Sequence, residues 1–228
     1  GIAAKNGLLA TFMPKPMFGQ NGSGMHCHQS LFTEAGNAFY DANDDFRLRV
    51  TAKQFMAGLL VHSRALSAVV APTVNSYKRL TPGYEAPVYV CWAQRNRSAL
   101  IRVPRYSPGR EESIRIELRF PDPSANPYLA FAAMLEAGLD GITNQMTPPP
   151  PVSEDVFEWT AAQREAHGVD VLPSTLLEAM DELAKDDVVR GALGNHIYEA
   201  YDRAKRREWE DYRLHVSNWE IQRYLETV

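Results

Sequence analysis

Two histidines, His26 and His28, stand one residue apart in the stretch NGSGMHCHQSLF, residues 21–32. In an extended strand, residues i and i+2 point to the same face, so both imidazoles would face one site. Neutral imidazole ligates metals such as Zn, Cu, Fe and Ni, and it also forms hydrogen bonds. Gly22 and Gly24 would let backbone approach a ligand closely. The pattern fits a half-buried strand with two solvated histidines equally well, because an H-x-H pair by itself is a weak signal.

The most strongly patterned segment is SIRIELRF, residues 113–120. Alternate side chains of a strand point to opposite faces, so one face carries Arg115, Glu117 and Arg119. That polar face fits a solvated sheet with cross-strand ion pairs of ~0.2–1 kcal/mol each. It also fits a polyanion site, in which the carboxylate binds metal and the guanidinium groups bind phosphate or a substrate carboxylate. The opposite face is apolar and must pack on helices: Ile114, Ile116, Leu118 and Phe120.

A second group of arginines lies close by in RNRSALIR, residues 95–102. Arg97 and Arg102 are five residues apart, so ideal alternation would put them on opposite faces of a strand. A bulge or a strand end must intervene if both serve one site. The sequence has no phosphate-binding G-x-x-x-x-G-K-[ST] loop. These arginines, with two histidines and one glutamate, therefore suggest ATP chemistry on an open sheet.

Composition narrows the class of protein. The 228 residues are 45% hydrophobic, enough for one large domain or one domain with a small appendage. The net charge of −4 argues against a general nucleic-acid binder, and no apolar run reaches membrane-spanning length. The N-terminal stretch lacks the pattern of a signal peptide, and two cysteines form no disulfide framework or zinc knuckle. We therefore expect a cytoplasmic protein without nucleic-acid or membrane partners.

The order of elements predicts an α+β fold with a largely antiparallel sheet backed by helices. Strands are expected at 7–14, 25–32, 88–94, 98–104 and 113–120, with a hairpin or loop at 36–46 and a loop at 75–87. One helix is predicted to start at a capping box, Thr51 with Gln54, and to end before Pro72. Another starts at Asn126. Residues 147–152 form a stiff connector between a core, 1–146, and a helical region, 152–228. The first helix is predicted to direct four residues toward the core: Phe55, Leu59, Leu66 and Val69. A long C-terminal helix is predicted to carry a broad apolar stripe: Ile197, Tyr201, Ala204, Tyr212 and Val216.

Three long stretches, residues 10–32, 75–104 and 114–142, closely resemble the C-terminal catalytic domain of type I glutamine synthetases. The resemblance implies a glutamine synthetase/guanido kinase-like fold with a partial barrel. It implies synthesis of glutamine from glutamate, ammonia and ATP through γ-glutamyl phosphate, with two or three Mg²⁺ or Mn²⁺ ions. The family assembles as a dodecamer of two stacked hexameric rings. Its N-terminal β-grasp domain has no counterpart here, so the resemblance implies an incomplete and inactive fragment.

The resemblance also assigns roles to single residues. His26 and Glu117 would ligate metal. Glu85, in PGYEAP, would close the site and take a proton from the nucleophile, and Gly83 would allow its loop to move. Nucleotide binding would fall to His28, Ser30, Arg97, Arg102 and Arg115. Glutamate and the transferring phosphoryl group would be held by Asn21, Gly22, Arg79, Glu85, Arg97 and Arg119, of which Arg79, Glu85 and Arg119 are the catalytic candidates.

The chain departs from the family at a few places. SPGREESIRIE lacks the lysine of the family's shorter SPKxRRIE stretch, and Arg110 is a weak substitute. Gln20 stands where an acid is common. Phe157 falls where one branch carries a tyrosine that is adenylylated, so we expect no such regulation. Three functions stay open: a glutamine synthetase, a relative that joins glutamate to a polyamine or methylamine, and a non-catalytic family member.

Overall fold

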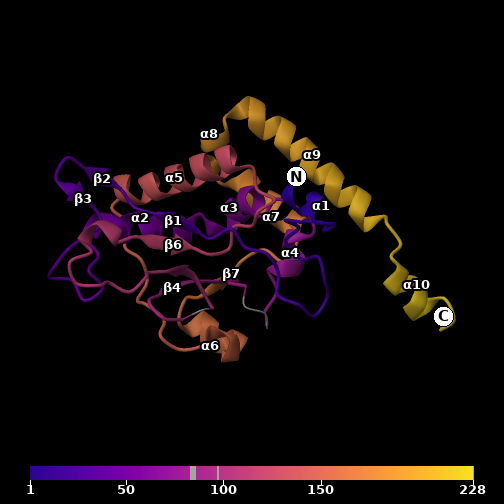
Figure 1. Ribbon diagram of the computed structural model, residues 1–228, viewed down its shortest axis with the longest axis horizontal. Coiled ribbons are helices and arrows are strands. Elements are labelled where there is room, and N and C mark those ends of the chain that lie inside the picture. The colour runs from indigo at the N-terminus through magenta and orange to yellow at the C-terminus, as the bar shows by residue number, and fades with distance from the viewer. Residues whose placement is uncertain (83–85, 97, 228) are drawn as a thin grey trace.

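The computed structural model describes residues 1–82, 86–96 and 98–227. Within these residues lie ten α-helices and seven strands, separated by loops and two short 3-10 turns (Figure 1). The helices are α1 Ile2–Lys5, α2 Val50–Val61, α3 Ser63–Val70, α4 Ser76–Arg79, α5 Pro127–Thr143, α6 Ala161–Ala166, α7 Leu176–Lys185, α8 Asp187–Leu193, α9 Asn195–Arg213 and α10 Asn218–Tyr224. The strands are β1 Cys27–Gln29, β2 Phe32–Thr33, β3 Gly36–Asn37, β4 Tyr89–Ala93, β5 Ala99–Arg102, β6 Ile116–Leu118 and β7 Asp170–Val171.

The main sheet has five strands in the order β1-β6-β5-β4-β7. β4 and β5 run parallel, and the other three pairings are antiparallel. In the described part of the chain, β1 and β7 are edge strands, so this sheet does not close into a barrel. β2 and β3 form a separate hairpin over residues 32–37, and most of the predicted hairpin or loop at 36–46 is a loop after it. The predicted α+β fold with a largely antiparallel sheet is confirmed.

A layer of helices covers one face of the sheet (Figure 1). α2 crosses α5 at Gly58 and Gly141, where an added Cβ on either glycine would overlap a backbone carbonyl oxygen of the other helix. α7 packs on α3 and α8 packs on α5, so the helices from α7 to the first part of α9 share one core with the residues before them. The predicted core residues of the first helical segment are buried, with at most 2% exposure: Phe55, Leu59, Leu66 and Val69.

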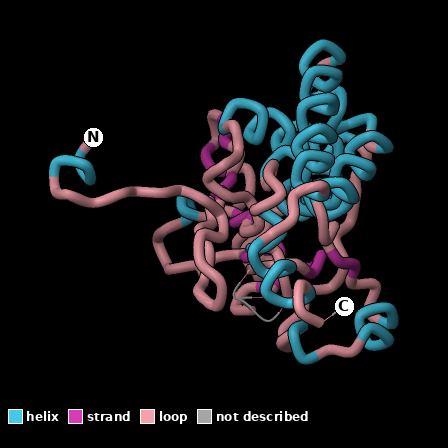
Figure 2. Tube along the Cα trace, turned by 90° about the vertical axis from the view of Figure 1, so that its right-hand side faces the viewer, coloured by secondary structure: helices cyan, strands magenta, loops and turns pink. Residues whose placement is uncertain are grey.

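The predicted strand at 7–14 was wrong. These residues form an exposed arm that projects from the body together with α1 (Figure 2). Leu9, for example, is 96% exposed. A strand is stabilised by a ladder of backbone hydrogen bonds, and no strand among the described residues pairs with this segment. The stretch is rich in apolar residues, but it has no strand partner among the described residues.

Other boundaries also differ from the predictions. α2 begins at Val50 and uses Arg49 as N-cap without a side-chain hydrogen bond, so the proposed capping box of Thr51 with Gln54 was wrong. The long C-terminal helix ends at Arg213, and α10 then lies apart from the body (Figure 1). Strand β7 falls within the region predicted to be helical. By contrast, Asn126 caps α5 as expected, accepting a hydrogen bond from the Tyr128 backbone amide.

Candidate active site

The register of three strands gathers the charged residues on one face of the sheet. His28 lies opposite Glu117 on β6, and Glu117 lies opposite Arg102 on β5. Directly opposed residues of antiparallel strands project to the same face. His26 stands just before β1 and contacts the same carboxylate. The sequence pattern predicted one face for the two histidines and, separately, one face for Arg115, Glu117 and Arg119. The pairing of β1, β6 and β5 brings these faces together and adds Arg102.

Glu117 is the centre of this cluster. Its side chain is 3% exposed, and its Oε1 lies 2.9 Å from His26 Nδ1 and 3.7 Å from Arg119 Nε. Its Oε2 accepts hydrogen bonds from Arg102 Nε at 2.7 Å and Nη2 at 2.6 Å. A buried carboxylate is costly unless it is paired, so the two guanidinium groups and the imidazole hold it in place.

The pKa values of His26 and His28 are both lowered, which favours their neutral forms. Burial lowers the pKa of His26, the positive charge of Arg119 lowers it further, and the Glu117 carboxylate opposes both. Burial also lowers the pKa of His28, whose Nδ1 accepts a hydrogen bond from Arg115 Nε at 2.9 Å. Neutral imidazole is the form that can ligate a metal.

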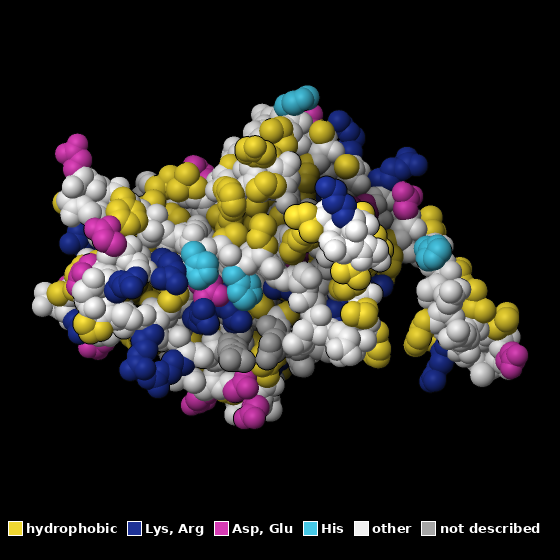
Figure 3. All heavy atoms as spheres, viewed as in Figure 1, with side chains coloured by type: hydrophobic (Ala, Val, Ile, Leu, Met, Phe, Trp, Pro, Cys, Tyr) yellow, Lys and Arg dark blue, Asp and Glu magenta, His cyan; other side chains and the backbone are white. Residues whose placement is uncertain are grey.

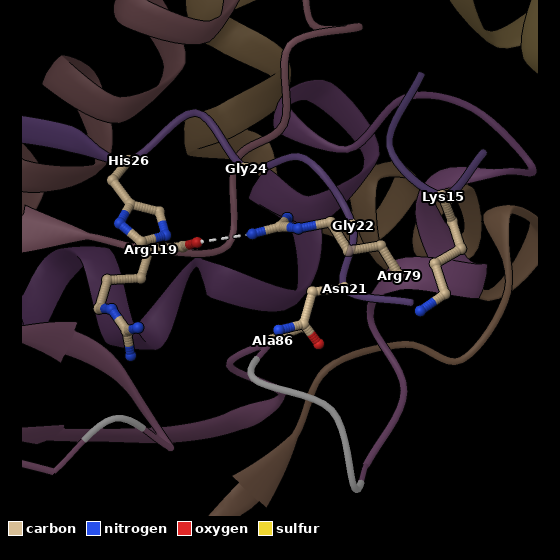
Figure 4. A pocket seen from close by; sticks show the side chains of 8 residues that line it. All are labelled: Lys15, Asn21, Gly22, Gly24, His26, Arg79, Ala86 and Arg119. Atoms are coloured by element: carbon tan, nitrogen blue, oxygen red, sulfur yellow. Dashed lines mark hydrogen bonds between the residues drawn. The ribbon is translucent and has the colours of Figure 1, made fainter. Parts of the chain in front are cut away.

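A pocket of about 480 Å³ opens beside this cluster. Figure 4 shows Arg79 crossing it toward the backbone of Arg119. Arg79 is 5% exposed and donates to three backbone carbonyls: Arg119 at 3.1 Å, Phe120 at 2.7 Å and Pro121 at 3.3 Å. Burial lowers the pKa of its guanidinium to about 10. The lining residues are Lys15, Asn21, Gly22, Gly24, His26, Arg79, Ala86 and Arg119.

The glycines of the first motif have a different steric role from the one expected. A Cβ on Gly22 would overlap the carbonyl oxygen of Pro14 and lie 3.1 Å from Arg79 Cγ. A Cβ on Gly24 would lie 2.6 Å from Arg79 Nη2. Both glycines therefore make room for the chain itself, above all for the Arg79 side chain, rather than for a ligand alone.

Lys15 is a site residue that the sequence patterns missed. It is 9% exposed, it lines the pocket, and its Nζ donates to the carbonyl of Gln20. The sequence offered one signal for this residue: Lys15 is a charged residue between two prolines in an otherwise apolar stretch, MPKP. Lysine is rarely buried unless it is paired, so a lysine in such a stretch indicates a specific partner.

A second hollow, of about 570 Å³, lies between β1 and α5. His26, His28 and Ser30 form its polar side, and Phe131 and Leu135 of α5 belong to its apolar side. Figure 3 shows histidine and acidic side chains near the middle of this face among Lys and Arg groups, with hydrophobic side chains gathered beside them. His26 lines both hollows, so ligands in the two spaces could meet at this residue. Glu85 and Arg97 lie outside the described residues.

His26 and Glu117 fit a metal site only in part. Imidazole and carboxylate are both metal ligands, and the two side chains converge. Magnesium, however, takes near-octahedral coordination by about six ligands, mostly oxygens. No group of three or more His, Cys, Asp or Glu side chains in residues 1–82, 86–96 and 98–227 could hold a metal. The two residues could therefore supply part of a coordination shell that needs further ligands.

The comparison with known proteins agrees with the geometry. A profile described as glutamine synthetase, catalytic domain, matches residues 1–224. The chain belongs to the glutamine synthetase family. It is 53% identical over 224 residues to glutamine synthetase of Thermotoga maritima, a match that covers 98% of this chain and 50% of the relative. The match to glutamine synthetase of Thermus thermophilus is 53% over 226 residues and covers 99% and 50%.

Solved structures of the family have the same fold. The structure described as apo GmaS without ligand superposes with a TM-score of 0.83 at 40% identity and covers 99% of this chain and 50% of that one. Plasmodium falciparum glutamine synthetase gives 0.81 at 27% identity and covers 94% and 49%. The chain thus spans about half the length of its glutamine synthetase relatives. No helix in the described residues is long and apolar enough to span a membrane.

Proposed function

We propose that this chain forms part of an ATP-dependent ligase that joins ammonia to the γ-carboxyl group of glutamate. The observation that carries the proposal is the buried Glu117, held between His26 and Arg102, beside a pocket lined with cations. Relatives named glutamine synthetase are 53% identical over nearly the whole chain. As the chain spans about half of those relatives, the activity belongs to a protein that supplies the other half.

The pocket chemistry suits a substrate with two carboxylates. Lys15, Arg79 and Arg119 line it, and none of its described lining residues is acidic. Guanidinium groups bind carboxylates and phosphoryl oxygens through paired donors. We assign the glutamate end to Asn21, Gly22, Arg79 and Arg119, with Glu85 and Arg97 completing it from outside the described residues.

The second hollow is the proposed nucleotide side. His28 and Ser30 line it, and Arg115 and Arg102 approach from neighbouring strands. In the first step, a γ-carboxylate oxygen of glutamate attacks the γ-phosphorus of ATP and ADP leaves. In the second, ammonia attacks the acyl carbon of γ-glutamyl phosphate, inorganic phosphate leaves, and Glu85 accepts a proton. Arginines hold and neutralise the transferring group, which is the main requirement of phosphoryl transfer.

His26 and Glu117 are the proposed contributions of this chain to a Mg²⁺ or Mn²⁺ site. Such an ion neutralises charge on the phosphate oxygens during transfer. The lowered pKa of His26 keeps its imidazole available as a ligand near neutral pH. The remaining ligands would come from the other half of the protein.

A second candidate function is ligation of glutamate to a larger amine. It is favoured by the likeness to GmaS, a γ-glutamylmethylamide synthetase, at 40% identity with a TM-score of 0.83. The test is an assay of the full-length protein with glutamate and ATP, in which ADP release is followed with ammonia, methylamine or putrescine as acceptor. Turnover with ammonia above the other two supports the first proposal, and turnover with methylamine or putrescine alone supports the second. No acceptor-dependent ADP release with any of them would refute both and favour a non-catalytic member.

The exposed C-terminal residues suit an interface between subunits. Trp219, Ile221 and Leu225 are 63%, 44% and 74% exposed, and α10 stands away from the body (Figure 1). Exposed apolar groups of this kind mark contact surfaces. We propose that the full-length protein assembles in the cytoplasm into two stacked hexameric rings and that α10 reaches the facing ring. Light scattering of the full-length protein tests the dodecamer.

A further inference from the structure

Three segments that hydrogen bonds link to one another meet at the cation-lined pocket, which His26 and Ala86 also line. The first is the loop of residues 15–24, which supplies Asn21 and two glycines. The second is α4, which supplies Arg79 at its C-terminal end. The third follows β6 and supplies Arg119. The width of the pocket depends on how these three segments are held relative to one another.

The loop is closed on itself near its base. The Ser23 backbone amide donates to the Pro14 carbonyl at 2.8 Å, and Lys15 Nζ donates to the Gln20 carbonyl. Gly22 packs so closely on the Pro14 carbonyl that a Cβ has no space. These contacts fix the shape of the loop. The Met25 backbone amide, just after the loop, donates to the Pro121 carbonyl at 2.8 Å and ties that end to the segment after β6, but none of these bonds reaches α4.

Asn75 makes the tie to α4. Its Oδ1 accepts a hydrogen bond from the Lys15 backbone amide at 2.7 Å, and its Nδ2 donates to the Lys15 carbonyl at 3.0 Å. Asn75 is the N-cap residue of α4, yet its side chain makes no capping hydrogen bond. The turn before α4 is instead closed by Thr73 and Ser76, whose hydroxyls lie 2.9 Å apart. The amide of Asn75 is thereby committed to the base of the loop, sixty residues away in the chain.

Arg79 completes the connection at the other end of α4. Its guanidinium donates to the carbonyls of residues 119–121 and passes beneath Gly22 and Gly24. A path of hydrogen bonds thus runs from the loop through Asn75 and α4 to the segment after β6. Asn75 itself does not line the pocket formed by the described residues.

We propose that Asn75 is a positioning residue: its amide sets the distance between the Asn21–Gly24 loop and Arg79, and so the fit of the glutamate end of the pocket. The role for glutamate rests on the proposed function, whereas the anchoring of the loop does not. Removing the amide releases two backbone hydrogen bonds at the base of the loop. It leaves every lining side chain present.

The test uses the full-length protein with Asn75→Ala, Asn75→Asp and a matched control, Asn126→Ala. The control removes another asparagine whose side chain accepts one backbone amide, that of Tyr128, at the start of α5. Hydrogen exchange of a peptide covering residues 16–25 is followed by mass spectrometry, together with steady-state kinetics. We expect Asn75→Ala to speed exchange of this peptide and to raise KM for glutamate, each about tenfold, the factor given by ~1.4 kcal/mol. KM for ATP should stay within about twofold of the wild-type value in both Asn75 variants.

Asn75→Asp keeps the acceptor for the Lys15 amide and loses the donor, so an intermediate effect is expected. Asn126→Ala should leave loop exchange and glutamate KM unchanged. Unchanged loop exchange in both Asn75 variants would overturn the inference, and so would a rise in ATP KM as large as that for glutamate. Equal loosening of the loop in Asn126→Ala would also overturn it, because the effect would then be global. If the wild type makes no γ-glutamyl product but Asn75→Ala still loosens the loop, the proposed function fails and the anchoring stands.

Discussion

Replacing His62 by alanine is expected to destabilise the chain by about 3 kcal/mol near pH 6. His62 lies at the junction of α2 and α3 and is 8% exposed. Its Nδ1 lies 2.7 Å from Asp186 Oδ2 and its Nε2 lies 3.0 Å from Asp140 Oδ2. Because Asp140 belongs to α5 and Asp186 is the N-cap of α8, one imidazole joins three parts of the helical layer.

The magnitude follows from the two contacts. A hydrogen bond to a charged group contributes about 1.5–3 kcal/mol, so two contribute about 3–6 kcal/mol. The carboxylate side chains of Asp140 and Asp186 are 21% and 15% exposed, so after His62 is removed they recover part of their hydration. The lower end of the range is therefore expected. For a chain of this length, about 3 kcal/mol corresponds to a fall in Tm of about 6–12 °C.

The effect depends on pH with a definite sign. Burial by itself lowers the pKa of His62, but the hydrogen bonds and charges of Asp186 and Asp140 exceed that effect and raise it above 6.5. A raised histidine pKa gives stability that is complete below pH 6.5 and is lost as pH rises through the folded-state value. Burial raises the pKa of Asp186, but His62 and backbone amides lower it below 3.8 overall, so its contribution is lost as pH falls through that lower value. The difference between wild type and His62→Ala should thus be largest between about pH 4 and pH 6.5.

The assay is urea unfolding of the 228-residue chain at pH 6 and at pH 9, followed by circular dichroism. Arg207→Ala is the control, because Arg207 and its partner Asp211 are 82% and 70% exposed and such pairs contribute less than about 1 kcal/mol. Other charged groups near His62 are Arg64, Glu182, Lys185 and Asp187, which line the adjoining hollow and stay unchanged in the variant. An equal loss at pH 6 and pH 9 would refute the role of the imidazolium. A loss at pH 6 no larger than that of Arg207→Ala would refute the importance of the contacts.

Further predictions concern packing, catalysis, regulation and the isolated chain. Gly141→Ala should cost more than about 3 kcal/mol of unfolding free energy, because its Cβ would overlap the Gln54 carbonyl, whereas Gly191→Ala, with nothing within 4 Å, should stabilise by about 0.5–1 kcal/mol. In the full-length protein, Glu85→Ala should lower the rate of synthesis ~10²–10⁴-fold and leave ATP binding nearly unchanged, and unchanged turnover would remove Glu85 from the mechanism. Incubation with an adenylyltransferase and ATP should add no AMP to this half of the protein, since Phe157 has no hydroxyl, and an intact-mass gain of one AMP mapped here would contradict that. The purified 228-residue chain should make no glutamine and bind Mg²⁺ weakly or not at all at millimolar concentration, because His26 and Glu117 offer few of about six ligands, and measurable synthesis would count against it.

Local patterns determined several elements correctly. The alternation in residues 113–120 predicted an apolar face, and Ile114, Ile116, Leu118 and Phe120 are all at most 2% exposed. Asn126 followed by Pro127 predicted the start of α5. These features depend on residues a few positions apart, where backbone geometry relates spacing directly to direction. The family resemblance rests on long motifs of the same local kind.

The sequence also proposed residues that the structure brings close together. His26, His28, Arg102, Arg115 and Glu117 were predicted as site residues, and the β1-β6-β5 register brings them together: His26 and Arg102 contact the Glu117 carboxylate, and Arg115 contacts His28. The spacing of residues along the sequence could not show that Arg102 reaches Glu117. That contact exists because β5 lies next to β6 in the sheet, and the order of strands in a sheet is not set by residue spacing. Lys15 was missed for a related reason, since its burial depends on a turn that returns to it.

Tertiary structure decided what lies beyond a few residues along the chain. Residues 7–14 have a strand-like pattern but form an exposed arm, because pairing needs a partner that no local pattern supplies. Residue 22 must be glycine because a Cβ there would overlap the Pro14 carbonyl oxygen and crowd the Arg79 side chain. The Asn75 side chain accepts a hydrogen bond from the Lys15 backbone amide, sixty residues away in the chain. His62 acquires its two carboxylates only where α5 and α8 pack against it. Contacts of this kind arise when whole elements pack, and their geometry is set by the surfaces that meet rather than by the order of residues in either one.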